Sequence, residues 1–283
     1  MSSEQSQSRD EFLQALGQKP TDELIQLALT ASDEEDNWGW DAISELRNRG
    51  TREVFDAART LCESVDPLER STGITILAQL GLKPRPFLDE TLELFFKLMA
   101  SEQDHRVLNA LGVGLGHISP DPRKVDPLLQ FKNHVHPEVR LGVAFGLSGE
   151  DDPSAIQALI ELSADEDDEV RDWATFALGS QTALDTPEIR EALYKRAADL
   201  DDPSNASGEG LVGLANRHDE RAFEFVSKHL QAGYTGTLVI EAAENLADPR
   251  LYPLLVKLAD DLTYIGYEKQ ALEDAIAACQ PRN

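Results

Sequence analysis

A repeated segment constrains the fold of this 283-residue chain more than any other feature. The stretch HPEVRLGVAFGLSG at 136–149 recurs 31 residues later as DDEVRDWATFALGS at 167–180, with matching valine, arginine, phenylalanine and leucine positions. Looser copies lie at 40–50, 66–77, 104–116, 203–214 and 235–246. One leucine column runs through Leu46, Leu77, Leu115, Leu147, Leu178 and Leu214, with spacings of 31 to 38 residues. A period of this length with variable loops is typical of a solenoid of stacked repeats.

Each repeat predicts two helices. The first helix begins at an aspartate or histidine suited to capping, and its apolar residues recur at i, i+4, i+7 and i+8, as in Val170, Ala174, Ala177 and Leu178. The second begins after an Asp-Pro turn, as at 121–122, 152–153 and 248–249, with proline at the first helical position. No segment is rich in β-forming residues, so we predict an all-α chain.

Small residues and arginines recur at fixed positions of the first helix. Gly114, Gly146, Ala177 and Gly213 share one column. Because glycine inside a helix costs up to about 1 kcal/mol, this column predicts that neighbouring backbones approach closely there. Arg70, Arg140 and Arg171 share another column, and we expect them to pair with the acidic loop of an adjacent repeat.

The pattern Asp-Pro-x-Val-Arg, then Ala-x-x-Ala-Leu-Gly, then Asp-Pro-Arg resembles bacterial HEAT repeats, especially the phycobilisome-lyase-type subgroup. The segments that carry the resemblance are 136–147, 167–179, 66–81 and 248–250, within a region of about 37–260. We therefore predict a right-handed α-solenoid of about seven HEAT-like helix pairs with N- and C-terminal capping helices. The expected organisation is a disordered tail at 1–8, capping helices at 9–36, repeats at 37–262, and a capping helix and tail at 263–283.

The net charge of −26, from 52 acidic and 26 basic residues, is the dominant compositional feature. Phosphate binding needs clustered Lys and Arg, so this balance argues against a nucleic-acid partner. It favours either simple solubility or a protein partner with a basic surface. No apolar run is long enough to span a membrane, and the polar N-terminus lacks a secretory signal. Cys62 and Cys279 are predicted to be buried free thiols, and we expect a cytoplasmic monomer.

The acidity is concentrated in residues 148–220, which carry 19 acidic and 5 basic groups, whereas residues 71–147 carry 8 of each. Its three runs occupy inter-helix loops, and stacking is expected to align them along one edge of the solenoid. The candidate partner-binding acidic edge consists of Glu150, Asp151, Asp152, Asp165, Glu166, Asp168, Glu169, Asp199, Asp201 and Asp202. Asp167 is assigned to capping instead.

A second candidate surface follows from the resemblance to HEAT solenoids, in which the second helices line the concave face. Residues predicted to point away from the core there are Asp56, Arg123, Asp126, Gln157, Glu161, Arg190, Tyr194, Arg221, Glu224, Lys228, Arg250 and Lys257. The acidic edge and this candidate concave face remain alternative binding sites.

No catalytic, cofactor-binding or metal site is predicted. His134, His136 and Glu138 could suggest a metal, but His136 shares its column with the capping residues Asp66, Asp104 and Asp167. Di-iron hydroxylases built on HEAT repeats use His-Glu dipeptides, and this chain has none. Asp172-Trp173 beside Arg171 is similar to part of the site of HEAT-like DNA glycosylases, but the acidic charge opposes that reading. Nothing marks a chromophore pocket of the bilin-lyase type.

We therefore expect a non-catalytic scaffold or adaptor that binds a basic protein. The alternative is an immunity or inhibitor protein that neutralises a basic toxin such as a nuclease. An enzyme of the bilin-lyase or DNA-glycosylase type is a third interpretation.

Overall fold

The computed structural model describes residues 12–31, 38–81, 85–118, 120–199, 204–232, 236–261 and 267–281. Within these ranges the regular elements are helices, and no strand occurs. The chain divides into two compact units, Met1–Gly146 (unit 1) and Leu147–Asn283 (unit 2). The predicted boundaries after residues 8, 36 and 262 lie outside the described residues and stay predictions.

Helices follow one another in pairs, as the repeats predict. Unit 1 contains α2 (Thr21–Ala28), α3 (Trp38–Arg49), α4 (Arg52–Cys62), α5 (Pro67–Ala78), α6 (Leu88–Met99), α7 (His105–Gly116), η1 (Pro122–Lys124), α8 (Val125–Leu129) and α9 (Pro137–Leu147), whose last residue begins unit 2. Unit 2 contains α10 (Pro153–Leu162), α11 (Asp168–Ser180), α12 (Pro187–Ala197), α13 (Ala206–Asn216), α14 (Glu220–Gln231), α15 (Thr237–Leu246), η2 (Pro249–Leu251), α16 (Tyr252–Asp261) and α17 (Tyr267–Ala278). Among the described helices, seven pairs run from α3–α4 to α15–α16, which confirms the α-solenoid.

Aspartates cap the helices of both layers. Asp66, Asp104 and Asp167 accept backbone hydrogen bonds at the start of α5, α7 and α11, at 2.9, 3.0 and 3.2 Å. Asp121, Asp152 and Asp248 cap η1, α10 and η2, each followed by proline at the first helical position. These side chains satisfy N–H groups that the helix itself leaves unpaired, so the predicted helix starts are confirmed.

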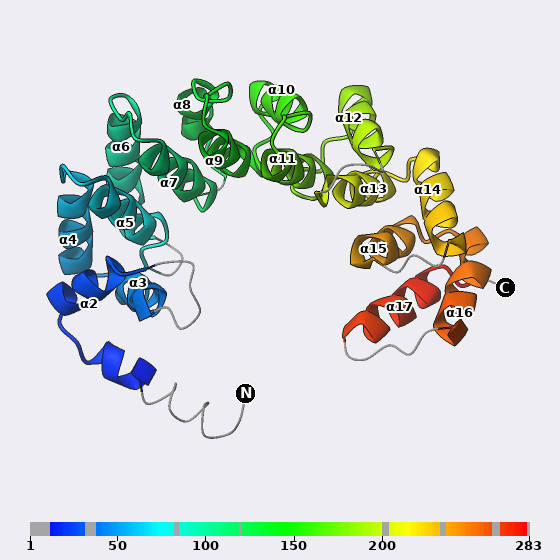
Figure 1. Ribbon diagram of the computed structural model, residues 1–283, viewed down its shortest axis with the longest axis horizontal. Coiled ribbons are helices and arrows are strands. Elements are labelled where there is room, and N and C mark those ends of the chain that lie inside the picture. Colours follow the sequence, from blue (N-terminus) through cyan, green and yellow to red (C-terminus); the bar gives the residue numbers. More distant parts are fainter. Residues whose placement is uncertain are drawn as a thin grey trace. The chain divides into compact units, whose positions relative to one another are not determined.

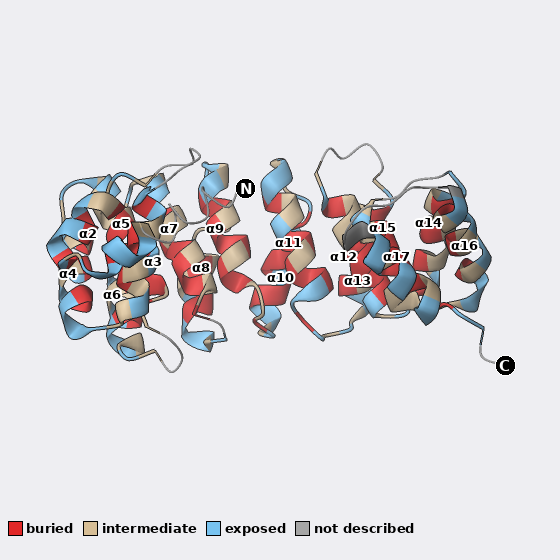
Figure 2. Ribbon diagram, turned by 90° about the horizontal axis from the view of Figure 1, so that it is seen from below, coloured by how far each residue is buried: buried red, intermediate tan, exposed pale blue. Residues whose placement is uncertain are grey.

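The core lies between the two helices of each pair, where buried segments of neighbouring helices face one another (Figure 2). Every member of the predicted leucine column in the first helices is buried, from Leu46 to Leu214. Cys62 and Cys279 are buried free thiols, and burial raises the pKa of the Cys62 thiol to about 12. The prediction for both cysteines is therefore confirmed.

Close packing of the first helices sets the curvature within each unit. A Cβ atom on Gly112 of α7 would lie 2.5 Å from the backbone of Gly142 in α9, and one on Gly213 of α13 would lie 2.6 Å from the Cα of Gly179 in α11. The second helices stand further apart than the first helices within each unit (Figure 1). Each unit therefore bends toward its first helices.

The first helices consequently line the inner side of each unit, with α3, α5 and α7 in unit 1 and α11, α13 and α15 in unit 2 (Figure 1). The second helices α4, α6 and α8, and α10, α12, α14 and α16, stand on the outer side. The prediction that the second helices line a concave face is therefore wrong. Of the glycines in the predicted small-residue column, Gly146 and Gly213 approach the backbone of a neighbouring first helix, whereas Gly114 faces side chains.

Candidate functional site

The acidic runs of unit 2 lie at opposite ends of its helices. Loops that follow first helices share one end, because Thr182 Oγ1 in the α11–α12 loop donates a 2.6 Å hydrogen bond to Asp151 in the α9–α10 loop. The run 165–169 precedes a first helix and lies at the other end, since the two helices of a pair run in opposite directions (Figure 2). The expectation of one shared edge is therefore wrong for Glu150, Asp151 and Asp152.

The members of the predicted acidic edge differ in their local contacts. Glu150 is buried, with 5% of its surface exposed, and Asp152 caps α10. Asp165 accepts a hydrogen bond from the backbone of Asp167 at 3.0 Å and orders the loop before α11. Asp201 and Asp202 lie outside the described residues. We define the acidic edge from here on by its members at one end of unit 2, which are Asp165, Glu166, Asp168, Glu169 and Asp199.

The predicted concave-face residues stand on the outer side and are largely engaged in ion pairs. Arg123, Arg221 and Arg250 each bind the aspartate two residues earlier, at 2.6, 2.9 and 2.5 Å. Each also reaches a carboxylate of the preceding second helix, namely Asp89, Glu191 and Glu220. The side chains of Asp56, Asp126, Gln157, Glu161, Glu224, Lys228 and Lys257 are exposed, and Tyr194 is half-buried beneath Arg221. The Asp-x-Arg motif therefore joins neighbouring repeats on the outer side.

The arginine column of the first helices makes contacts in addition to the one predicted. Arg70 pairs with Glu102 of the next repeat at 2.8 Å, as expected. All three members, however, donate to backbone carbonyls five and six residues earlier, at Ser64 and Val65, His134 and Val135, and Asp165 and Glu166. The column therefore also orders the loop before each first helix.

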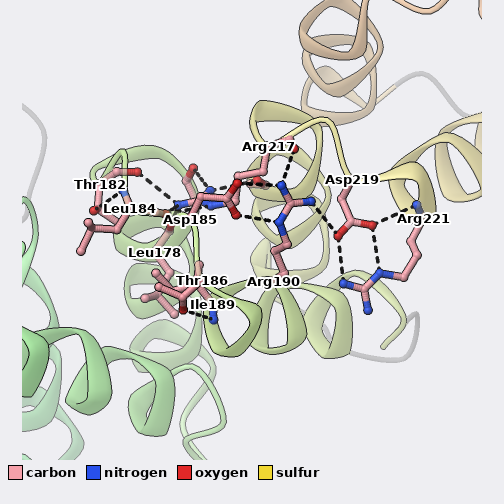
Figure 3. Close-up of polar contacts among 12 residues, drawn as sticks. Leu178, Thr182, Leu184, Asp185, Thr186, Ile189, Arg190, Arg217, Asp219 and Arg221 are labelled. Atoms are coloured by element: carbon pink, nitrogen blue, oxygen red, sulfur yellow. Dashed lines mark hydrogen bonds and ion pairs between the residues drawn. The ribbon is translucent and has the colours of Figure 1, made fainter.

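A polar network ties α11, α12, α13 and α14 together in unit 2 (Figure 3). Buried Asp219 accepts from Arg221 at 2.9 Å and from Arg190 at 3.1 Å, and Arg190 also forms a fork with Asp185. The hydrogen bonds from Arg221 and Arg190 hold the pKa of Asp219 well below its usual range. Arg190 thus has a structural role, whereas the sequence analysis placed it on a candidate binding surface.

The inner helices of unit 2 carry acidic side chains close to one another. Asp172 of α11, Glu209 of α13 and Glu241 of α15 lie on three successive first helices, and we call them the carboxylate row. Burial, then the neighbouring Asp172 and Glu241, raise the pKa of Glu209 to about 7. Burial and Glu244 also raise the pKa of Glu241. The ionised carboxylates of the row therefore repel one another on the inner side of unit 2.

An exposed aromatic residue lies next to Asp172 along α11. Trp173 is 37% exposed and meets Phe176 edge-on with ring centroids 5.7 Å apart. An exposed indole suits a guanidinium or ammonium group, because the face of the ring attracts a cation. Sequence reasoning considered Asp172 and Trp173 only in connection with DNA glycosylases, and it missed Glu209 and Glu241. Their signal was an acidic residue within a largely apolar first helix, in the first turn of α13 and inside α15.

The inner side of unit 1 carries basic side chains where unit 2 carries carboxylates. A hollow of about 210 Å³ is lined by Trp40 and Arg47 of α3, by residues of α5, and by His117 after α7. Burial and Arg85 lower the pKa of Arg47 to about 10, and burial with both arginines lowers that of His117. Arg47 and Arg85 donate to the carbonyls of Thr75, Ala78 and His117. These cations close helix ends, so the acidic features of unit 2 are the better candidate site for a basic partner.

Comparison with known proteins places these repeats in a family. A model described as HEAT repeats matches residues 92–179 and 125–211. Residues 92–211 are HEAT repeats. Both matches begin in an outer helix, α6 or α8, and end in an inner helix, α11 or α13.

Similar proteins share this HEAT architecture. Protein YibA of Escherichia coli K12 is 30% identical over 138 residues, which are 49% of this chain and 47% of that relative. The alignment thus spans about half the length of the curated relatives it matches, the second being YibA of strain O157:H7. A crystal structure of E. coli YibA is similar with a TM-score of 0.72 and 21% identity, covering 99% of this chain and 97% of that one.

A more distant structural similarity is to a chain in the structure of Kap95p with RanGDP. Its TM-score is 0.54 at 14% identity, over 97% of this chain and 42% of that one. These similarities concern the fold alone. None of the described helices is both long enough and apolar enough to traverse a bilayer.

The raised pKa of Glu209 predicts a pH-dependent loss of stability. The folded chain holds the extra proton between the ordinary value of 4.5 and about 7, so stability falls as pH rises through this window. Glu209→Gln removes the repulsion, and at pH 8 it should raise the free energy of unfolding by about 1 kcal/mol, after allowance for solvent screening of this half-exposed group.

Urea unfolding at pH 4.5 and pH 8 measures this effect. The gain should be present at pH 8 and absent at pH 4.5, where the wild-type side chain is protonated. Glu224→Gln, at an exposed position of the outer helix α14, is the matched control and should change stability little at either pH. An equal gain at both pH values would contradict the electrostatic explanation.

Proposed function

We propose that this HEAT-repeat chain is a non-catalytic scaffold that binds a basic protein segment on the inner side of unit 2. The observation that carries the proposal is the carboxylate row, in which Glu209 is half-buried between acidic neighbours. This arrangement lowers the stability of the folded chain at neutral pH, so its benefit lies elsewhere. A cationic side chain placed between the carboxylates would neutralise the repulsion, and exposed Trp173 on the same helix as Asp172 offers an aromatic face for a further contact.

The acidic edge supports the same proposal at longer range. Glu166, Asp168 and Glu169 are exposed at the start of α11, the helix that carries Asp172 of the row. Only one or two carboxylates gain from the positive end of a helix, so the negative charge gathered at the start of α11 exceeds what the helix end can offset. Their field extends about 8 Å at physiological ionic strength and would accelerate the approach of a basic partner.

Removal of the row should weaken this interaction. The variant Asp172→Asn, Glu209→Gln, Glu241→Gln keeps side-chain shape and removes three charges, and we expect the affinity for the partner to fall at least about tenfold. The partner is first captured from an extract of the native host on the wild-type chain, and its dissociation constant is then measured with purified proteins. The control variant Asp260→Asn, Glu161→Gln, Glu224→Gln makes the same chemical changes on outer helices and should bind normally.

The two acidic features should affect different rate constants. Asp168→Lys with Glu169→Lys should slow association and reduce its salt dependence, whereas the row variant should mainly speed dissociation. Unchanged affinity in the row variant, or a captured partner without a basic surface, would overturn the proposal. A single basic toxin bound with one-to-one stoichiometry would identify the scaffold as an immunity or inhibitor protein. The concentration of acidic charge in residues 148–220, with 19 acidic and 5 basic groups, favours such a dedicated partner.

A further inference from the structure

Three side chains able to bind a transition metal meet at the N-terminal ends of two consecutive inner helices in unit 1. His105 is the first residue of α7, His136 directly precedes α9, and Glu138 lies in the first turn of α9. One ligand atom from each lies within 4.8 Å of the other two. The rings of His105 and His136 stack with centroids 4.3 Å apart and an interplanar angle of 20°.

Helix capping does not account for His136. The aspartates at the equivalent positions accept hydrogen bonds from backbone N–H groups of the helices that follow, as Asp104 does at 3.0 Å and Asp167 at 3.2 Å. In the part of the chain that the structure describes, the imidazoles of His105 and His136 make ring contacts but no hydrogen bond. The backbone N–H of His136 instead donates to Nδ1 of His134 at 3.2 Å. The ring nitrogens of His105 and His136 therefore remain available to a ligand.

We infer that His105, His136 and Glu138 form a binding site for a divalent transition metal of the zinc class, which links α7 to α9. Imidazole nitrogen and carboxylate oxygen are zinc ligands, and three protein ligands with water in the fourth position form an open tetrahedral site. Zinc–ligand bonds of about 2.1 Å place tetrahedral ligand atoms about 3.3 Å apart. His136 and Glu138 are exposed and His105 is half-buried, so side-chain rotation can close the remaining distance.

General attraction of cations to an acidic protein does not explain such a site. Residues 71–147, which contain all three side chains, carry eight acidic and eight basic groups. Two imidazoles and one carboxylate select borderline metals such as Zn²⁺ over Mg²⁺, which prefers oxygen ligands. Selectivity for zinc therefore separates this site from diffuse binding on the acidic surface of unit 2. The inference is independent of the proposed function.

Isothermal titration of the full chain with ZnCl₂, in a buffer that does not bind metals, tests the site. We expect one high-affinity zinc ion per chain and an increase in the melting temperature on zinc addition, with neither effect from MgCl₂. His105→Ala and His136→Ala should each weaken zinc binding at least about 100-fold, beyond the 10- to 100-fold typical of losing a residue that only supports a metal ligand. Glu138→Gln should weaken it as well while keeping the shape of the side chain.

His218→Asn is the matched control, because it removes an exposed imidazole in unit 2 at a positive φ of 47°, a conformation that asparagine tolerates. It should retain wild-type zinc affinity. Circular dichroism without metal should show the same helix content in all variants, since the three side chains lie at the surface. The inference is overturned if the wild-type chain takes up no stoichiometric zinc at 100 µM, on the order of a hundred times a micromolar dissociation constant, or if His105→Ala and His136→Ala bind zinc as the wild type does.

Discussion

Replacement of Gly112 by alanine is expected to destabilise unit 1 by about 2 kcal/mol, and this should be one of the largest effects of a single methyl group in the chain. The added Cβ would lie 2.5 Å from the carbonyl carbon and oxygen of Gly142. These are backbone atoms of α9, so they cannot rotate away, and α7 and α9 must separate. Overpacking costs up to about 3 kcal/mol, against which the better helix propensity of alanine returns up to about 1 kcal/mol.

Urea unfolding followed by circular dichroism measures the effect of Gly112→Ala. Gly17→Ala is the control, because no atom lies within 4 Å of the Cβ position there. That change should leave the unfolding midpoint within about 0.5 kcal/mol of the wild type. Stability equal to the wild type in Gly112→Ala would mean that the inner helices do not need their close approach, and the explanation given for the curvature would fail with it.

Arg217→Met is expected to destabilise unit 2 by about 3 kcal/mol, because it removes a half-buried charged donor that serves several carbonyl groups. Arg217 donates to the carbonyls of Leu178 and Gly179 at the end of α11, at 2.8 and 3.1 Å. It also donates to those of Thr182 and Leu184 in the following loop, at 3.2 and 2.8 Å (Figure 3). Burial lowers the pKa of Arg217, so the hydrogen bonds offset a real desolvation cost.

The matched control for Arg217 is Arg250→Met. Arg250 has ion pairs with Asp248 and Glu220 at 2.5 and 2.8 Å but lies exposed on the outer side of unit 2. Exposed pairs are screened by water, so this change should cost less than about 1 kcal/mol. Arg217→Lys should fall between the two because it keeps the charge and loses the planar fork. If the two methionine variants lose the same stability, burial does not decide the strength of these contacts.

The helices and their pairing were predictable from the sequence because their causes are local. Asp66, Asp104 and Asp167 cap helices that begin within two residues of their predicted positions, and the leucine column is buried throughout. Helix capping and the 3.6-residue apolar period each involve residues a few positions apart, so both can be recognised within one short segment. The contacts of the arginine column were predictable only in part, because residue types do not reveal which backbone carbonyls accept its hydrogen bonds.

The candidate site was much less predictable, because it depends on residues 30 or more positions apart. Glu209 and Glu241 act on one another only because α13 packs beside α15, and His105 meets His136 only because α7 packs beside α9. Acidic runs are visible in the sequence, but their separation onto two ends of unit 2 depends on helix direction. A search along the chain therefore found the acidic edge and missed the carboxylate row.

The sequence by itself determined an all-α chain of seven helix pairs, its capping residues, its buried column and its strong local acidity. Only the tertiary structure decided which helix of each pair faces inward, because curvature follows from the difference in spacing between the two layers. Gly112 against Gly142 and Gly179 against Gly213 bring the first helices together, whereas the second helices stand further apart. The difference in helix spacing exists only after the repeats have stacked. Because of it, the candidate binding surface on the inner side is the row of Asp172, Glu209 and Glu241 and not the outer helices that carry Arg190 and Arg221.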